Sequence, residues 1–550
     1  MLYPKIPLAQ SIIEIFRAKG IQNIVISPGS RNAPLTIGFS NHQYFKCYSV
    51  ADERSAAFFA LGIAQQLQQP VAVVCTSGSA VLNYYPAFAE AFYNQIPFVV
   101  VSADRPLDKI DIGDGQTIRQ ENVFANHSLF NANLTQEACD KNDELINEAI
   151  ETSIRLKGPV HVNVPFEEPL YETVEQLLVN PKIISSTTTE SPVNGLNSFA
   201  TIWNQAKKKL VLIGGLDPNT IQQSILDFLG NDNSIVVMTE VTSNVHHPNF
   251  ITNIDTIITP FSENDFLDFQ PEVLLTIGGM IVSKRIKAFL RKFQPQQHWH
   301  IDALRAYDTF GCLTKHFKTT SPAFFEQFMP LVNSTESDYQ TKILAIRAKR
   351  ASKHTEYLYA IPFSDLKAFD ILLPTIPTDY SLQISNSSPI RYAQLCTIHP
   401  NVTVFCNRGT SGIDGSTSTA IGAAVTSTKP TILITGDVGF LYDSNALWNN
   451  YIPNNFKIIL INNGGGGIFR ILPGHQENTT FNTYFETSHC LTAEHLAKMY
   501  GFGYLIASDE KSLKDNLNLL YQSDKPTILE VFTPTKNNDK ILLDYFKIVV

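Results

Sequence analysis

Short apolar runs that end in small or polar residues recur along the chain, with helical stretches between them. The first four runs cover residues 24–30, 71–79, 98–106 and 160–165. Continuous apolar runs of this length are typical of parallel strands that are buried on both faces. The pattern therefore predicts a doubly wound α/β unit in which loops leave the carboxyl ends of the strands.

Two more series of such runs follow. One comprises residues 210–215, 235–238, 273–279 and 298–301, and the other comprises 402–406, 431–437, 458–463 and 527–532. Segment 181–200 is rich in Ser, Thr, Pro and Asn, which predicts an interdomain linker, and 335–370 is polar and helical in pattern. We therefore expect three consecutive doubly wound α/β domains, over residues 1–180, 195–345 and 365–550.

Composition agrees with several packed domains. The chain has 550 residues, of which 44% are hydrophobic and 17% charged, a balance that excludes a disordered or fibrous protein. Lys and Arg number 42 against 51 Asp and Glu, a net charge of −9. A general nucleic-acid binder needs a large cationic surface, so we expect no nucleic-acid partner. Any anionic ligand must be met by cations gathered locally.

The cysteines and the N-terminal segment bear on location. Seven cysteines include no C-x-x-C pair, so neither a zinc ribbon nor a disulfide framework is indicated and we expect reduced thiols. Segment 8–16 places apolar residues at helical spacing with charges between them, unlike a signal peptide. No apolar run is long enough to cross a bilayer. We expect a cytoplasmic protein without a membrane span.

Two motifs at predicted strand ends suggest a site for a metal and a diphosphate. Gly436 and Asp437 follow one strand, and Asn462 and Asn463 follow the next, before a run of glycines at 464–467. Carboxylate and amide oxygens suit Mg²⁺, and glycines let the backbone approach phosphate closely. Either motif alone is more often a turn or loop, but the pairing favours a site. A nicotinamide site is less favoured, because no matching acidic residue follows the glycines.

This pair of motifs resembles that of the thiamine diphosphate-dependent enzymes, which begins Gly-Asp-Gly and ends Asn-Asn. The third position here is Val438. The resemblance implies three α/β domains of the thiamine diphosphate-dependent decarboxylase type, with thiamine diphosphate and Mg²⁺ or Mn²⁺ as cofactors. It implies that Asp437, Asn463 and the carbonyl of Gly465 hold the metal, and that the cofactor also contacts Gly436, Ile413, Ile468 and Phe469.

The same family needs a glutamate that hydrogen-bonds the pyrimidine ring of thiamine, and the candidate is Glu53. It stands between a short strand and a strongly apolar helix. Taken alone, Glu53 is more readily explained as an ordinary first-turn residue that complements the helix dipole. Thr76-Ser77-Gly78, which resembles the segment after the family's glutamate, supports the catalytic interpretation.

Further strings narrow the resemblance to members of this family that act in menaquinone biosynthesis. They include 27–31 (SPGSR), 103–106 (ADRP), 283–285 (SKR), 407–409 (NRG) and 411–415 (SGIDG). The resemblance implies a transferase that decarboxylates 2-oxoglutarate and adds the succinyl carbanion equivalent to isochorismate. Another thiamine diphosphate-dependent 2-oxo acid decarboxylase or carboligase, such as an acetohydroxyacid synthase, stays an alternative, as does a silent binding module with the same fold.

Both implied substrates are dicarboxylates, which suits the cations in the matched strings. The resemblance implies catalytic roles for Glu53, Gln116, Arg391 and Arg408, although Gln116 alone is equally a loop amide that satisfies backbone groups. It implies a substrate-binding set of Ser30, Arg31, Arg105, Lys284, Arg285, Ser387, Arg391 and Arg408. The last three are expected at the part derived from 2-oxoglutarate, and Arg31, Arg105, Lys284 and Arg285 at isochorismate.

The family also builds its site between the N-terminal domain of one chain and the C-terminal domain of another. The resemblance therefore implies a homodimer or a homotetramer.

Overall fold

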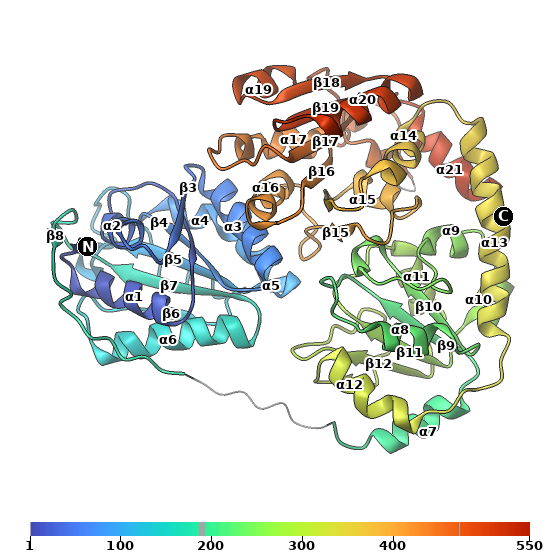
Figure 1. Cartoon of the computed structure of the whole chain (residues 1–550), viewed down its shortest axis with the longest axis horizontal. Coiled ribbons are helices and arrows are strands. Elements are labelled where there is room, and N and C mark those ends of the chain that lie inside the picture. The colour runs from blue at the N-terminus through green and yellow to red at the C-terminus, as the bar shows by residue number, and fades with distance from the viewer. Residues whose placement is uncertain (1, 186–192, 472–473, 550) are drawn as a thin grey trace.

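A computed structural model describes residues 2–185, 193–471 and 474–549. It contains three parallel sheets in three bodies: an N-terminal body at the left of Figure 1, a middle body at the lower right and a C-terminal body above it. The three predicted α/β units are confirmed. Their exact bounds stay predictions, and residues 186–192 of the predicted linker lie outside the described residues.

The N-terminal sheet has the strand order β3-β2-β4-β5-β7-β6. Helices α1 (Pro7–Ala18), α2 (Ala33–Asn41) and α6 (Asp140–Arg155) cover one face, and α3 (Glu53–Leu67), α4 (Ser79–Asn83) and α5 (Tyr85–Asn94) cover the other. The strands are β2 (Asn23–Ile26), β3 (Lys46–Ser49), β4 (Val71–Cys75), β5 (Phe98–Asp104), β6 (Asn131–Asn133) and β7 (Pro159–Pro165). A separate antiparallel pair joins β1 (Tyr3–Pro4) to β8 (Thr173–Val174).

The middle sheet has the order β10-β9-β11-β12-β13. One face packs on α7 (Leu196–Gln205), α8 (Gln223–Gly230) and α12 (Ser321–Phe328), and the other on α9 (Ile254–Ile258), α10 (Glu263–Phe269) and α11 (Lys284–Lys292). The strands are β9 (Lys209–Ile213), β10 (Ile235–Thr239), β11 (Val273–Ile277), β12 (Gln297–Ile301) and β13 (Lys315–Phe317). Residues 196–200, predicted as linker, begin α7 because Leu196 and Ala200 are buried on one helix face.

The long helix α13 (Tyr339–Ala360) leads to the C-terminal body along the right-hand edge of Figure 1. The C-terminal sheet has the order β15-β14-β16-β17-β19-β18. Its strands are β14 (Ser381–Ile384), β15 (Thr403–Phe405), β16 (Thr431–Gly436), β17 (Phe456–Asn462), β18 (Gly503–Ala507) and β19 (Thr527–Phe532). Helices α16 (Ser416–Thr426), α17 (Asp437–Tyr442) and α19 (Glu494–Met499) lie on one face, and α14 (Asp365–Leu372), α15 (Ser388–Ala393), α20 (Glu510–Gln522) and α21 (Asn538–Ile548) on the other.

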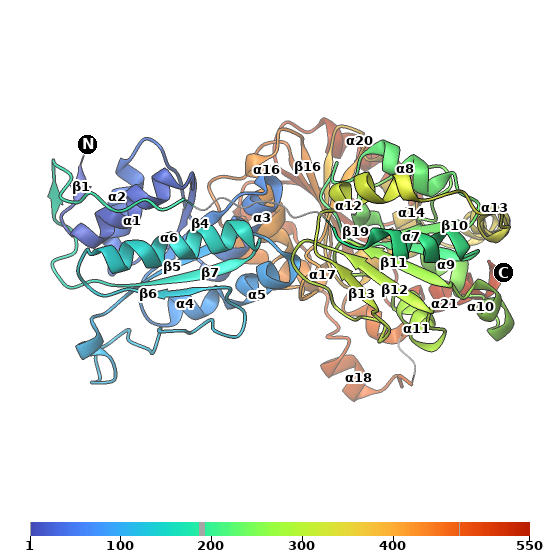
Figure 2. The same ribbon diagram turned by 90° about the horizontal axis from the view of Figure 1, so that it is seen from below.

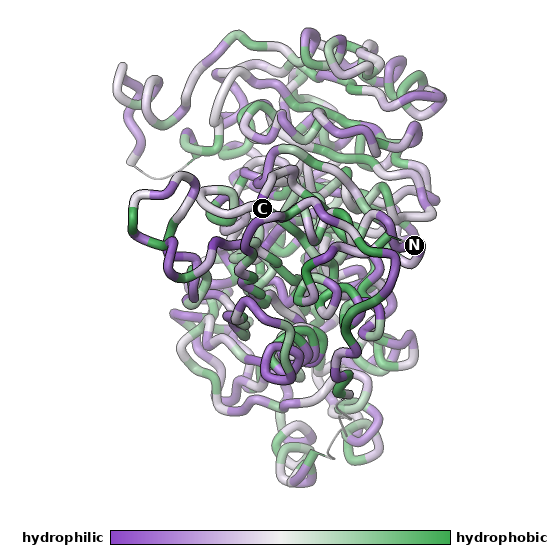
Figure 3. The backbone as a smooth tube through the Cα atoms, turned by 90° about the vertical axis from the view of Figure 1, so that its left-hand side faces the viewer, coloured by the Kyte–Doolittle hydropathy of each residue, from purple (hydrophilic) through white to green (hydrophobic). Residues whose placement is uncertain are grey.

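Helices α3 and α16 join the N-terminal and C-terminal bodies, and Figure 2 shows them side by side. A Cβ on Gly62 would lie 2.0 Å from the carbonyl oxygen of Thr419, and one on Gly422 would lie 1.9 Å from that of Phe59. Glycine at both positions therefore lets the two helix backbones touch. One apolar core runs through this contact, and Figure 3 shows hydrophobic stretches gathered in the middle of the molecule.

Two smaller expectations also have an outcome. The cysteines, all of which lie within the described residues, form no disulfide. In the part of the chain that the structure describes, no helix has both the length and the apolar character needed to span a membrane.

Candidate active site

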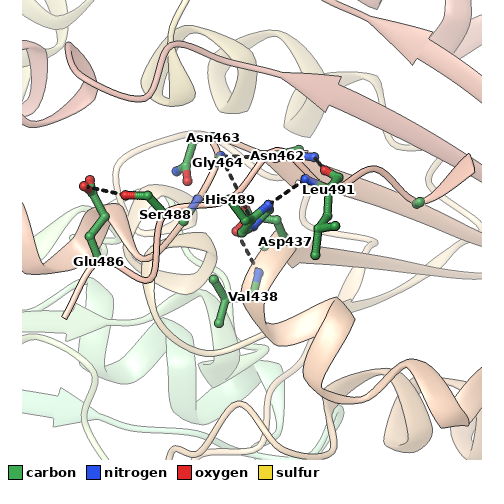
Figure 4. A network of polar contacts seen from close by, with 12 residues as sticks. Asp437, Val438, Asn462, Asn463, Gly464, Glu486, Ser488, His489 and Leu491 are labelled. Carbon is green, nitrogen blue, oxygen red and sulfur yellow. Dashed lines mark hydrogen bonds and ion pairs between the residues drawn. The ribbon is translucent and has the colours of Figure 1, made fainter. Parts of the chain in front are cut away.

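The two predicted motifs meet at the carboxyl edge of the C-terminal sheet. Asp437, directly after β16, accepts hydrogen bonds at Oδ2 from the backbone N–H groups of Gly464 (2.8 Å) and Gly465 (3.0 Å). Its Oδ1 accepts the N–H of Val438 at 2.7 Å (Figure 4). Gly464 has φ +77° and Gly465 φ +149°, a backbone that L side chains rarely adopt. The glycines therefore let successive amides point at one carboxylate.

Asp437 is buried, and burial raises the pKa of its carboxyl group, although the backbone hydrogen bonds oppose this. Asn463 stands beside it and donates from Nδ2 to Oδ2 of Asp365 at 2.9 Å. The Oδ1 of Asn463 is buried and has no hydrogen-bond partner among the described residues. A carboxylate and a free amide oxygen at one sheet edge form a donor set that fits Mg²⁺ or Mn²⁺.

His489 also lies at this site, although no motif in the sequence points to it. Its Nε2 lies 3.4 Å from Oδ2 of Asp437, and its Nδ1 accepts the N–H of Leu491 at 3.1 Å (Figure 4). Its backbone N–H donates to the carbonyl of Gly464 at 3.0 Å. The contact between His489 and Asp437 forms because the chain folds back after the glycine run, and no local motif predicts that course of the chain.

The apolar residues predicted for the cofactor lie around the same edge. Ile413 packs on α17: a Cβ added to Gly439 of that helix would lie 3.7 Å from the Cβ of Ile413. Ile468 is half-buried, and Phe469 is 36% exposed, with its ring centroid 6.2 Å from that of Phe485. A partly open apolar surface therefore follows the glycine run.

Arg391 and Arg408 form a cationic pair next to these loops. Arg408 donates from Nη1 to Oδ1 of Asn386 at 2.7 Å. The Nε atoms of both arginines are buried and have no acceptor within the described residues. Burial, and then the charge of Arg408, lowers the pKa of Arg391. Buried guanidinium donors are costly when unpaired, so this arrangement suits an anionic ligand. Ser387, at φ +73°, directly precedes α15, the helix that carries Arg391, and its side chain makes no capping hydrogen bond there.

The middle domain adds further charge to this region. Lys284 and Arg285 are exposed at the start of α11, and the Arg285 guanidinium lies 4.9 Å from the ring centroid of Phe546. Lys287, which was not among the residues predicted from the sequence, is half-buried. Burial lowers the pKa of its ammonium group; the charge of Glu240 opposes this shift and the charge of Arg408 adds to it. Lys287 lies one helical turn after Lys284, and that spacing was the available signal.

Buried carboxylates hold the loops that carry these cations. Glu240 accepts the N–H groups of Val282 and Ser283, each at 2.8 Å, and burial raises its pKa to about 7. Glu90, from the N-terminal domain, accepts the N–H groups of Gly409 (2.7 Å) and Thr410 (2.6 Å). Neither glutamate belongs to a recognisable motif, because each acts through the backbone of a distant segment.

The N-terminal candidates all lie at the carboxyl edge of their own sheet, in loops except for Glu53, which is the first residue of α3. Arg31 is buried and donates to the carbonyl of Phe166 (3.0 Å) and to Oε1 of Glu168 (3.1 Å). Arg105 donates from Nε to the carbonyl of Gly115 at 3.1 Å. The remaining three are less enclosed: Ser30 and Gln116 are exposed and Glu53 is half-buried.

Within one chain, no hydrogen bond or ion pair among the described residues joins these N-terminal candidates to Asp437 or Asn463. The neighbours of Glu53 do reach the C-terminal domain. Asp52 accepts from Nδ2 of Asn445 at 2.7 Å, and Arg54 donates to the carbonyl of Tyr442 at 2.8 Å. The structure therefore brings together the C-terminal and middle-domain candidates, and leaves the N-terminal group at a separate edge.

Comparison with known proteins assigns the family. Residues 6–129 match the thiamine pyrophosphate enzyme N-terminal TPP binding domain, 186–355 match the middle domain of thiamine pyrophosphate, and 387–531 match the C-terminal TPP binding domain. A 2-succinyl-5-enolpyruvyl-6-hydroxy-3-cyclohexene-1-carboxylate synthase from Flavobacterium psychrophilum is 71% identical over 547 residues, 100% of both chains. The chain belongs to this synthase family. Synthases from Christiangramia forsetii (51% identical, 99% of both chains) and Porphyromonas gingivalis (37%, 97% of this chain and 96% of the relative) agree.

The family membership confirms several predictions from the sequence. The chain is a thiamine diphosphate-dependent enzyme that catalyses a carbon–carbon bond-forming transfer, with three domains of that family's type. The matches favour the synthase over the alternative decarboxylase or carboligase. The roles of individual residues stay predictions.

Proposed function

We propose that the chain decarboxylates 2-oxoglutarate and adds the succinyl carbanion equivalent to isochorismate by 1,4-addition, which gives 2-succinyl-5-enolpyruvyl-6-hydroxy-3-cyclohexene-1-carboxylate. The observation that carries the substrate assignment is the Arg391–Arg408 pair, whose buried Nε donors have no acceptor among the described residues. A substrate carboxylate offers the planar acceptor that a guanidinium matches. Ser387 is the nearby hydroxyl in the same set.

Asp437, the Oδ1 of Asn463 and the carbonyl of Gly465 would hold a magnesium or manganese ion. The unpartnered amide oxygen supports this choice. The amides of Gly464 and Gly465 fix the carboxylate of Asp437. Thiamine diphosphate, when bound, supplies the electron sink for decarboxylation. Gly436, at the end of β16, leaves room beside the metal ligands.

Glu53 would share a proton with the pyrimidine ring of the bound cofactor, and Gln116 would lie near the reacting groups. Ile413 would hold the bound cofactor, and Ile468 and Phe469 would form an apolar wall that excludes water. Arg31, Arg105, Lys284 and Arg285, with Ser30, bind isochorismate. Arg31 and Arg105 already have acceptors in their own domain, so they bind with their remaining donors.

The complete site requires a second copy of the chain. In one chain the N-terminal candidates remain at an edge of their own, with Ser30 and Gln116 exposed. A homodimer in which this edge faces the Asp437 edge of the partner joins both groups, and a homotetramer contains two such pairs.

The direct test combines purified protein with thiamine diphosphate, Mg²⁺, 2-oxoglutarate and isochorismate and follows isochorismate loss and carbon dioxide release. We expect isochorismate to disappear only in the complete mixture. Release of carbon dioxide with unchanged isochorismate would instead indicate a simple decarboxylase. Sedimentation of the loaded protein tests the oligomer, and a monomer with full activity would contradict the shared site.

A further inference from the structure

Asp365 lies behind the metal site and is absent from every sequence motif of that site. It is the first residue of α14 and stands 98 residues before Asn463 in the chain. Its side chain is 2% exposed. Oδ2 accepts Nδ2 of Asn463 at 2.9 Å, and Oδ1 accepts the hydroxyl of Thr533 at 2.5 Å. Its backbone N–H donates to Oδ1 of Asn538 at 2.9 Å.

These contacts decide which way the amide of Asn463 points. An ionised carboxylate can only accept hydrogen bonds, so Asn463 must turn its NH₂ group toward Asp365. The amide oxygen is then directed away from Asp365, and this is the buried Oδ1 that has no partner among the described residues. The other carboxylate oxygen, Oδ1, accepts the hydroxyl of Thr533, so Oδ2 is the oxygen that faces Asn463.

We propose that Asp365 is a positioning residue that holds the Asn463 amide with its oxygen toward the metal. The inference rests on the proposed role of Asn463 as a metal ligand. Without the carboxylate, the amide of Asn463 can rotate and turn its NH₂ group toward the metal site. The hydrogens of that group carry partial positive charge, so a cation repels them. Residues behind metal ligands act in this way by fixing the orientation of the ligand, and their loss typically lowers metal affinity about 10- to 100-fold.

The experiment measures metal binding rather than turnover. Thiamine diphosphate is held constant at pH 8, Mn²⁺ is titrated, and free Mn²⁺ is followed by electron paramagnetic resonance. We expect Asp365→Ala to raise the dissociation constant for Mn²⁺ about 10- to 100-fold. Asp365→Asn should lie between this variant and the wild type, because an asparagine can accept from the Asn463 NH₂ with its oxygen or donate to the Asn463 oxygen with its own NH₂. Thr533→Val, the matched control, keeps the Asp365–Asn463 hydrogen bond and should change the constant least.

A double-mutant cycle separates positioning from general damage. Asn463→Ala removes the ligand itself, so adding Asp365→Ala to it should cause little further loss of Mn²⁺ affinity. If Asp365→Ala weakens Mn²⁺ binding equally in the wild-type and Asn463→Ala proteins, the positioning role is wrong. It is also wrong if Asp365→Ala as a single change leaves Mn²⁺ binding unchanged. If Asn463→Ala does not weaken Mn²⁺ binding, the proposed metal site itself is wrong.

Folding is checked by circular dichroism and thermal unfolding without metal or cofactor. If Asp365→Ala does not fold, Asp365→Asn takes its place in the double-mutant cycle and is compared with Thr533→Val. Wild-type Mn²⁺ affinity in a folded Asp365→Asn protein would then overturn the inference. An equal loss of Mn²⁺ affinity from Asp365→Asn in the wild-type and Asn463→Ala backgrounds would overturn it as well.

Discussion

The N-terminal and C-terminal sheets are built to one plan and carry different chemistry. Numbered within each domain, both have the strand order 2-1-3-4-6-5. The third strand is followed by Thr76, Ser77 and Gly78 in one domain and by Asp437, the first residue of α17, in the other. The loop after the second strand leads to Glu53 in one and Arg408 in the other. Strand order therefore fixes where these loops lie, and the residues within them decide what each edge can bind.

The two edges also differ in burial. Asp437 and Asn463 are 4% and 9% exposed, because their own chain folds back over the glycine run. At the N-terminal edge, Ser30 and Gln116 are exposed. Asp437 and Asn463 are therefore enclosed by their own chain, whereas two candidates at the N-terminal edge are open to solvent.

The strongest test of the comparison removes the acid at the N-terminal edge. Glu53→Gln keeps the shape of the side chain and removes the shared proton. We expect kcat to fall about 100- to 10,000-fold, the range for loss of general acid–base catalysis. The melting temperature should stay near that of the wild type, because the position is half-buried and makes no hydrogen bond that this change abolishes. Wild-type turnover would contradict the role of Glu53.

At the C-terminal edge, Arg408→Ala should mainly impair use of 2-oxoglutarate. Loss of a charge-assisted hydrogen bond predicts a rise in its KM of about 10- to 100-fold, with a smaller change for isochorismate. Lys514→Ala, at an exposed position on α20, is the control and should leave both constants unchanged. Equal kinetics for wild type and Arg408→Ala would remove this arginine from the site.

Two glycines with nearly equal φ angles, Gly20 and Gly464, sharpen the comparison further. Gly20, with φ +78°, lies before the N-terminal sheet and has nothing within 4 Å of an added Cβ. Gly464, with φ +77°, would place that Cβ 3.1 Å from the Thr535 hydroxyl. Both changes to Ala carry about 1–2 kcal/mol of backbone strain. Only Gly464→Ala should also weaken thiamine diphosphate binding, as measured by equilibrium dialysis; equal binding in the two variants would contradict the assignment.

The smallest expected effect concerns pH. Asp443 is buried in the C-terminal domain, accepts the N–H and hydroxyl of Ser418, and has a pKa raised by burial to about 7 from 3.8. Between these values the unfolded chain binds fewer protons than the folded one, so this group's contribution to stability falls as pH rises. Asp443→Asn should remove that part of the pH dependence. Melting temperatures from pH 4 to 8 measure it; parallel curves for the two proteins would be the contrary result.

Much of the fold followed from the sequence because buried parallel strands are continuous apolar runs. Strands β4, β5 and β17 begin and end close to the predicted positions. Strand β14 was missed, because Ser381–Ile384 mixes polar and apolar residues although it lies inside the sheet. Candidate site residues could be named from the sequence where several of them stand in one string, as at 436–437 and 462–465, and their roles stay predictions. Asp365, Glu240 and His489 had no such string.

By itself, the sequence determined the family, the three α/β units and the loops that carry Glu53, Asp437, Asn463 and the arginines. It did so because parallel-sheet loops follow apolar runs and family motifs are local. The tertiary structure decided which buried carboxylates hold those loops, how the Asn463 amide is turned, and that the N-terminal candidates form an edge of their own. Those features depend on hydrogen bonds between segments that are far apart along the chain, such as Asp365 and Asn463. A local sequence pattern cannot predict contacts of this kind.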